Sequence, residues 1–410
     1  MTAATTEDKD SMKTDHTRAT ADAAHTHGRG GTPQASRAER ATSFTLADFP
    51  VPNGREEDWR FSPVDRLQRL FAGGFTSAGP VVTSTTDDGV TLERVGRDDP
   101  RPGQVGAPGD RVAAAAWDSF GEALVVTVPK NHVAAEPTIL AITGDAAGEA
   151  AEPAAQHVLV RAEQHSESLV VLDHRGGAEL AQTVEIDVAD GARLTLVSIQ
   201  DWDDGAIHVS SHRTRIGRDA RLRHIVVTLG GDIVRLTPDA VFAAPGGEVE
   251  MLGLYFTDAG QHQEHRLFVD HAVPSCVSRV TYKGALQGAG AHSVWVGDVL
   301  IRKEAEGTDT YELNRNLVLT EGARADSVPN LEIETGEIEG AGHASATGRF
   351  DDEQLFYLRS RGIAEADARR LVVLGFFAEL INQIGVPLVQ ERLMAAIEAE
   401  LDRTMEAAPR

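Results

Sequence analysis

The pattern of hydrophobic and polar positions divides the chain into four segments. Residues 1–42 are polar and aperiodic, which predicts a disordered tail. Residues 43–122 mix apolar and polar positions and predict an N-terminal segment that is partly helical. Residues 123–348 contain closely spaced apolar runs with almost no helical period and predict a β core, whereas residues 349–410 have helical periodicity.

Two features refine the N-terminal segment. Ser62-Pro63 precedes Val64 and Leu67, a spacing that predicts a short helix with proline in its first turn. Residues 90–112 are rich in Asp, Gly, Pro and Arg, so we expect a loop there.

The β core is predicted from short runs of β-branched and aliphatic residues separated by turns that contain Gly or Asp. This region is too long for one ordinary β-sandwich, and a β-solenoid, which stacks one coil per repeat, accommodates it. The clearest runs are Leu124–Val128, Thr138–Ile142, His157–Val160, Ser168–Leu172 and Thr183–Val188.

A weak repeat supports the solenoid. Asp190-Gly191 begins a short motif that returns at Arg218-Asp219, at Gly246-Gly247 and at Glu321-Gly322, each time in a turn before an expected strand. The first three copies start about 28 residues apart, and solenoids have periods of about 20–50 residues. Chance recurrence of common turn residues is the alternative explanation.

The C-terminal segment predicts three helices. The first ends at Gly362, the second runs from Ala364 to about Ile384, and Pro387 can start a third after a break at Gly385. Apolar side chains of the second helix extend beyond the single stripe that packing on one core requires, so we expect part of this surface to face another protein. The residues expected to bind a partner are Leu371, Leu374, Phe376, Phe377, Leu380 and Ile381.

Composition excludes several functions. The formal net charge of −24 and the lack of basic runs disfavour nucleic acid as a partner. The single cysteine, Cys276, excludes an internal disulfide and a four-cysteine cluster or zinc site. No stretch approaches the roughly 20 apolar residues of a membrane span, and no signal peptide is evident, so we expect a cytoplasmic protein without membrane contact. The chain also lacks any Gly-Lys pair, and with it the P-loop of an ATPase.

Two groups of residues could form a metal site or a catalytic pair, but the sequence evidence for each is weak. His262, His265, His271 and Cys276 offer nitrogen and sulfur ligands. On a strand, however, the first two histidines would point to opposite faces, so packed or solvated histidines and a buried apolar cysteine are the favoured interpretation.

Glu332 and Glu334 could share a strand face and act as an acid–base pair, as in solenoid enzymes that cleave polysaccharides. The chain lacks a secretion signal, and its few tryptophans are scattered, so we expect no enzyme of this kind.

The end of the β core and the start of the helices carry an ordered set of motifs. Pro329-Asn330-Leu331-Glu332-Ile333 is followed by Gly342-His343-Ala344 in an expected glycine-flanked turn, and then by Leu355-Phe356-Tyr357-Leu358-Arg359-Ser360-Arg361-Gly362-Ile363. Together with Glu57-x-Trp59-Arg60 and Ser278-x-x-x-x-Lys283, this set resembles the SufB/SufD family of iron–sulfur cluster assembly proteins. The resemblance covers about residues 44–402 and is greater to the SufD branch, because Asn314 stands where SufB-like chains carry a cysteine.

The resemblance implies a fold and a set of partners. The fold would be a mainly β protein, a right-handed parallel β-helix over 123–348 flanked by helical segments over 43–122 and 349–410. The chain would be a non-catalytic scaffold that pairs with a SufB-like paralogue and binds a SufC-like ATPase through its C-terminal helices. A homodimer is possible when the chain is isolated. No cofactor would be bound stably by this chain alone, and a transient iron–sulfur cluster would form at the interface with the SufB-like partner.

His343 matches the family histidine that contributes to this shared site, and it is our candidate metal or cluster-assembly residue. Ala341 replaces a cysteine that SufD-like chains often carry two residues earlier. A lone imidazole cannot hold a cluster by itself, so the chemistry would be divided between chains. The alternatives are a stand-alone β-solenoid enzyme acting on polysaccharide and a purely structural adaptor in which His343 only completes the last coil.

Overall fold

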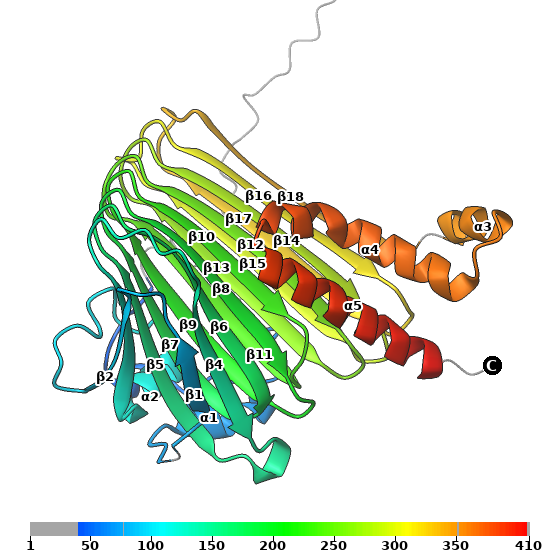
Figure 1. Ribbon diagram of the computed structural model, residues 1–410, viewed down its shortest axis with the longest axis horizontal. Helices are drawn as coiled ribbons and strands as arrows, with labels where there is room; N and C mark the ends of the chain where they lie inside the picture. Colours follow the sequence, from blue (N-terminus) through cyan, green and yellow to red (C-terminus); the bar gives the residue numbers. More distant parts are fainter. Residues whose placement is uncertain (1–39, 77, 351, 408–410) are drawn as a thin grey trace, which may run out of the picture. The chain divides into compact units, whose positions relative to one another are not determined.

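Strands and tight turns alternate along the chain and stack into a β-solenoid of about seven turns, which confirms the predicted mainly β fold (Figure 1). The computed structural model describes residues 40–76, 78–350 and 352–407. Most of the tail predicted for residues 1–42 lies outside the described residues. All five runs singled out in the sequence are strands.

The strands form two nine-stranded sheets, and from β3 onward consecutive strands alternate between them. Sheet I consists of β1 (Val81–Thr85), β4 (Thr138–Asp145), β6 (Glu167–Gly177), β8 (Arg193–Trp202), β10 (Arg221–Thr228), β12 (Glu248–Thr257), β14 (Val277–Leu286), β16 (Asp309–Val318) and β18 (Gly340–Arg349). Sheet II consists of β2 (Thr91–Gly96), β3 (Glu122–Val128), β5 (Pro153–Ala162), β7 (Glu179–Val188), β9 (Ile207–Ile216), β11 (Ile233–Phe242), β13 (His262–His271), β15 (His292–Ile301) and β17 (Arg324–Ile333).

The first edge of each sheet is formed by an antiparallel strand, whereas all other neighbours are parallel. β1 pairs with β4 in sheet I, and β2 pairs with β3 in sheet II. The loop expected over 90–112 is therefore wrong for Thr91–Gly96. Tertiary pairing with the edge of β3 decides the structure of these residues, and Leu92 packs against the core of the solenoid.

The sequence repeat corresponds to one coil of the solenoid. Its first three copies lie in the turns before β8, β10 and β12, strands that neighbour one another in register in sheet I. Gly191 has a φ of 68°, and a Cβ added there would lie 2.3 Å from the ring of His165, so the turn requires glycine. The fourth copy, at Glu321-Gly322, precedes β17 in sheet II, and its similarity reflects turn chemistry alone.

Aliphatic side chains from both sheets fill most of the space between them, which we call the lumen. Leu194, Leu222 and Val249 illustrate the arrangement, because they stack in register on successive coils and are almost fully buried. Burial of each such side chain contributes roughly 1.5–3 kcal/mol to stability. The lumen is not entirely apolar, and six buried histidines lie among the aliphatic residues: His174, His208, His212, His224, His265 and His271.

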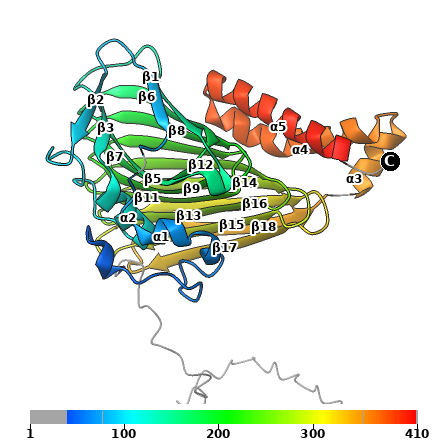
Figure 2. The same ribbon diagram turned by 90° about the horizontal axis from the view of Figure 1, so that it is seen from below.

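The N-terminal segment packs on the outer face of sheet II (Figure 2). Its helical elements are η3 (Leu46–Asp48), η4 (Val64–Arg66), α1 (Gln68–Ala72) and α2 (Arg111–Ser119), and a further short turn, η5 (Gly148–Ala150), lies between β4 and β5. Trp59, Leu70 and Phe71 are buried against Val209 and Ile233 of the sheet. The short helix predicted after Ser62-Pro63 is confirmed as two pieces, η4 and α1.

Three helices follow the solenoid, as predicted: α3 (Asp352–Ser360), α4 (Glu365–Ile384) and α5 (Pro387–Ala407). α4 and α5 lie side by side over the outer face of sheet I (Figure 1), where Val373, Phe377 and Leu393 share a core with Val197 and Ile225. α4 stops at Gly385, which adopts the left-handed conformation with φ of 62°. No helix in the described ranges is long and apolar enough to cross a bilayer.

Polar contacts fix these helices on sheet I. The Lys283 ammonium of β14 donates to the Phe376 carbonyl oxygen at 3.2 Å and pairs with Glu379 at 2.8 Å. Arg223 donates to the carbonyl oxygens of Gln383 and Ile384 at the end of α4, where a helix accumulates partial negative charge. The position of α4 is therefore set by both apolar and charged contacts.

Candidate functional site

The solenoid ends on two strands that have a neighbour on one side only among the described residues. β18 is the last strand of sheet I, and β17 is the last strand of sheet II (yellow to orange in Figure 1). Most side chains on these two strands are half-buried or exposed, whereas those of the preceding coils are largely buried. We call the end of the lumen bordered by β16, β17 and β18 the open end.

His343 lies on β18 at the open end, with its side chain on the lumen face. Ser345, two residues later, donates to the Ser327 hydroxyl oxygen of β17 at 2.8 Å, and Ala341, two residues earlier, packs against the core of the lumen. Alternate residues of a strand share a face, so His343 lies between them on the same face. The imidazole is exposed because no further coil of the described residues covers it.

The expected turn at His343 is wrong. Gly340 and Gly342 continue the parallel ladder with β16, in which their neighbours are Asp309 and Tyr311. The backbone hydrogen bonds of this ladder favour an extended strand over a turn. His343 is therefore held by regular sheet structure at the rim of the last coil.

Glu312 lies beside His343 in the sheet. It is the residue of β16 in direct register with His343, and both point into the lumen. The Glu312 side chain is buried, and neither carboxyl oxygen has a hydrogen-bond partner within the described residues. Burial raises its pKa to about 8, so the carboxyl group is largely protonated at neutral pH.

Asn314 and Asn316, the next two lumen residues of β16, are by contrast hydrogen-bonded. Asn314 donates to the Tyr255 hydroxyl oxygen at 3.0 Å and accepts a hydrogen bond from Ser327 at 2.7 Å. Asn316 donates to the Asn314 carbonyl oxygen at 2.8 Å. These bonds join β12, β16 and β17 and order the floor of the open end.

Sequence inspection missed Glu312, although a signal was present. The lumen positions of β16 are Thr310, Glu312, Asn314, Asn316 and Val318, and the first four of them are polar. A similar polar alternation occurs at the lumen positions of β9, which are His208, Ser210, His212 and Thr214, so the signal is not specific to β16. Without the register, the polar residues of β16 could equally have occupied the outer face of the sheet.

The histidine and cysteine group predicted as a weak metal site does not converge. His262 faces outward, where its Nε2 atom lies 3.2 Å from the Glu264 carboxylate. His265 points into the lumen and stacks on Tyr255, and Cys276 is a buried residue of the lumen core. This confirms the strand interpretation, and the described residues contain no group of three or more His, Cys, Asp or Glu side chains that could hold a metal ion.

Glu332 and Glu334 do not form a strand pair of the kind considered. β17 ends at Ile333, so Glu334 lies beyond the strand. Its carboxylate accepts a hydrogen bond from the Lys303 backbone amide at 3.2 Å. The two carboxylates thus belong to different local structures.

Half of the residues expected to bind a partner pack against other residues of the same chain. Phe377, Leu380 and Ile381 are buried in the core between α4 and sheet I and are not exposed on the surface of this chain. Sequence periodicity showed the width of the apolar surface but not which part the sheet covers. Leu374 and Phe376 are half-buried, and Leu371 is 50% exposed.

A second exposed apolar surface lies on α3, where Phe356 is 75% exposed and Tyr357 is 56% exposed. With Leu371 of α4, these side chains form what we call the α3 surface. Sequence inspection used the two aromatic residues only as part of a motif. These side chains are exposed because no described strand packs against this side of α3, a tertiary feature that the helical pattern could not predict.

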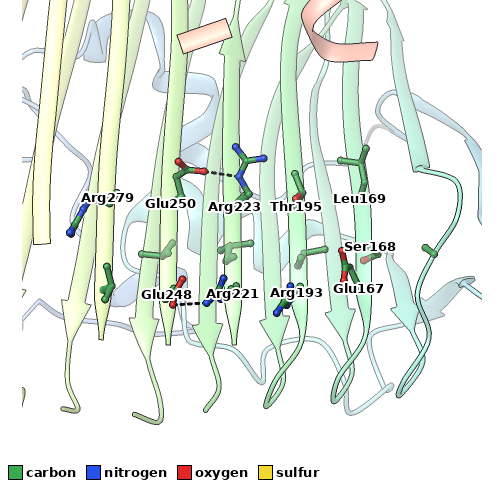
Figure 3. Close-up of a pocket in the computed structure, with 15 residues that line it drawn as sticks. Glu167, Ser168, Leu169, Arg193, Thr195, Arg221, Arg223, Glu248, Glu250 and Arg279 are labelled. Carbon is green, nitrogen blue, oxygen red and sulfur yellow. Dashed lines mark hydrogen bonds and ion pairs between the residues drawn. The ribbon is translucent and has the colours of Figure 1, made fainter. Parts of the chain in front are cut away.

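A groove of about 590 Å³ runs across the outer face of sheet I beside α4 (Figure 3). Arginine and glutamate side chains from successive strands line it, and their charges are locally compensated. Arg221 pairs with Glu248 at 3.0 Å, and Arg223 pairs with Glu250 at 2.6 Å (Figure 3). Because Arg223 also donates to the end of α4, the groove contributes to helix docking.

Comparison with known proteins identifies relatives of the chain. A family model described as "SUF system FeS cluster assembly, SufBD core domain" matches residues 143–376. An iron–sulfur cluster assembly SufBD family protein of Mycobacterium tuberculosis is 57% identical over 376 residues, which cover 90% of this chain and 94% of that protein. The iron–sulfur cluster assembly protein SufD of Escherichia coli is 24% identical over 387 residues, covering 86% and 89% of the two chains. A further SufBD family protein, from Mycobacterium leprae, is 27% identical over 219 residues, covering 53% of this chain and 25% of that protein.

Proposed function

The chain belongs to the SufBD family of iron–sulfur cluster assembly proteins, and from this premise we propose that it is a SufD-like scaffold subunit without catalytic activity of its own. The observation that carries the proposal is the open end, where an exposed histidine lies at the rim of a solenoid whose last strands have, among the described residues, a neighbour on one side only. The proposed task is to complete an assembly site together with a partner.

In this role an iron–sulfur cluster is cargo that the chain helps to build and then releases. His343 supplies one nitrogen ligand, and a single imidazole does not hold an iron–sulfur cluster. The described residues bring no third ligand close to it. We therefore infer that a cluster is held only transiently, with a partner supplying the remaining ligands.

The proposed partner at the open end is a SufB-like paralogue. β17 and β18 each present a row of backbone donors and acceptors, and such edges favour pairing with another strand. A second solenoid can continue both sheets at once, which excludes water from the site around His343. A second copy of this chain offers the same edges, so the isolated chain is expected to form a homodimer.

The proposed contact for a SufC-like ATPase is the α3 surface. Exposed aromatic side chains are common in protein interfaces, and Phe356, Tyr357 and Leu371 are not used to pack the solenoid. Deleting 364–410 would be a poor test of this contact, because it would also expose Val197, Ile225 and the other outer apolar residues of sheet I. Measurements on the full chain avoid this problem.

Amide hydrogen exchange of the full chain should reveal both contacts. Addition of a SufB-like paralogue is expected to slow exchange in β17 and β18, because their free backbone groups become hydrogen-bonded or buried. Addition of a SufC-like ATPase is expected to slow exchange in α3 and at the start of α4. Mass spectrometry of peptides from 324–349 and 352–372 measures the two effects separately.

The internal strand β10 serves as the control. It is already hydrogen-bonded to β8 on one side and to β12 on the other, so its exchange should not change. Unchanged exchange in 324–349 with a stably bound paralogue would place the interface elsewhere and contradict the proposal. Unchanged exchange in α3 with bound ATPase would reject the α3 surface as its docking site.

A further inference from the structure

The open end contains a second chemical group that the family comparison does not assign. We propose that Glu312 is a ligand for ferrous iron or a similar divalent metal ion, acting together with His343. This proposal rests on the proposed function, because it deepens the role of the same site. It would make the chain's contribution a two-residue half-site with one nitrogen and one oxygen donor.

Glu312 and His343 are directly paired residues on neighbouring parallel strands, where Cα atoms are about 4.8 Å apart and side chains point in the same direction. Side chains so placed can converge on one ion about 2.0–2.2 Å from each donor. No hydrogen bond joins the two groups, so neither is occupied by the other.

The carboxyl group of Glu312 is isolated from the hydrogen bonds around it. Both of its oxygens lack a partner in the described structure, although the side chain is almost completely buried. An unsatisfied buried polar group costs about 1–3 kcal/mol. Nearby, Ser327 donates a hydrogen bond to Asn314, and Asn314 donates one to Tyr255. These hydrogen bonds do not include the Glu312 carboxyl group.

Gly297 of β15 faces Glu312 across the lumen, and a Cβ at that position would lie 2.8 Å from the Glu312 Oε1 atom. A larger residue would therefore crowd the carboxyl group. Imidazole nitrogen and carboxylate oxygen are both ligands that ferrous iron accepts, and the exposed side of His343 leaves the remaining positions to a partner or to water.

Titration of the full chain with Fe²⁺ in the absence of oxygen, and with Co²⁺ as an air-stable probe, tests the proposal. The substitution Glu312→Gln preserves the shape of the side chain and removes the carboxylate, and it should weaken binding of one ion per chain about tenfold or more. Glu339→Gln, at an exposed position just before β18, is the matched control and should leave binding unchanged.

The variants separate this inference from the proposed function. If His343→Ala loses the ion but Glu312→Gln binds it as the wild type does, Glu312 is not a ligand and the inference fails while the role of His343 stands. If neither substitution changes binding, the ions lie elsewhere, and both the inference and the ligand role of His343 fail.

Stability provides an independent readout. Replacing Glu312 by the apolar Met removes two unsatisfied oxygens, so Glu312→Met should raise Tm while it abolishes binding of the ion. A large fall in Tm for both Glu312→Met and Glu312→Gln would show that the carboxyl group is a structural element and would overturn the proposal.

Discussion

Lowering the pH from about 7.5 to about 5.5 should destabilise the protein severely and lower its Tm by on the order of 10 °C or more. The cause is the group of six histidines in the lumen. Burial lowers the pKa of His174, His224 and His271 to about 4 and that of His265 to about 3. It also holds the pKa of His208 and His212 well below the usual value.

The direction of this pH dependence follows from the number of protons that each state binds. In the unfolded chain these histidines have pKa values of about 6.5, so between about pH 4 and pH 6.5 the unfolded state binds more protons than the folded state. Their contribution to stability is complete above about pH 6.5 and is lost as the pH falls toward 4. Burial raises the pKa of Glu312 to about 8 and that of Asp239 to about 6. These two groups bind more protons in the folded state, so they stabilise the fold as the pH falls and partly offset the histidines.

At pH 6 the histidines and the two carboxyl groups together take up roughly three protons on unfolding. The free energy of unfolding therefore changes by about 4 kcal/mol per pH unit. Urea unfolding at a series of pH values measures this slope. His224→Gln should reduce it by about one proton, whereas replacement of the exposed His165 by Gln should leave it unchanged. A free energy of unfolding that stays constant between pH 7.5 and 5.5 would mean that the histidines are not buried in neutral form.

Replacement of Glu264 by alanine should destabilise the fold by about 3–5 kcal/mol. Glu264 is fully buried between sheet II and the N-terminal segment, where its carboxylate lies 3.4 Å from both Arg235 and Arg266 and accepts a hydrogen bond from Ser62 at 2.6 Å. Burial acts to raise the pKa of Glu264, but the two guanidinium groups and His262 outweigh it and hold the pKa well below its usual range.

The expected cost arises because the substitution leaves two buried cations with fewer partners. Arg235 also stacks on Trp59, with its guanidinium carbon 3.9 Å from the ring centroid, so the loss should loosen the N-terminal segment first. Glu248→Ala is the matched control, because Glu248 pairs with Arg221 on the surface and should contribute no more than about 1 kcal/mol. Urea unfolding measures the free energy of unfolding of both variants. A similar decrease for the two would show that the buried ion pairs of Glu264 stabilise the fold no more than a surface ion pair does.

The general architecture could be predicted from the sequence because its signals are local. Glycine and aspartate at turns, alternating aliphatic runs and the coil-length repeat all follow from the geometry of one strand and one turn. The helix boundaries at Gly362 and Gly385 were predictable for the same reason, since a glycine ends a helix through its own backbone.

The site could be predicted only in part, because it depends on register and on tertiary contacts. His343 was found through its motif, but its position in β18 follows from the ladder with β16. Glu312 was invisible until that register placed it beside His343. Phe377 and Leu380 matched a partner-binding pattern equally well before sheet I was seen to cover them. A pattern of apolar residues shows that a surface must be covered, and not which surface covers it.

Cluster formation on a complex that contains His343→Ala tests the central claim most directly. The complex of this chain with SufB-like and SufC-like partners should assemble normally, because His343 is exposed and its truncation should change stability by no more than about 1 kcal/mol. The rate of cluster formation, followed by visible absorption during anaerobic reconstitution with iron and sulfide, should fall about tenfold or more. Thr347→Ala, on the same face of β18, should assemble clusters as the wild type does. Wild-type rates for His343→Ala would identify the chain as a purely structural adaptor and contradict the account.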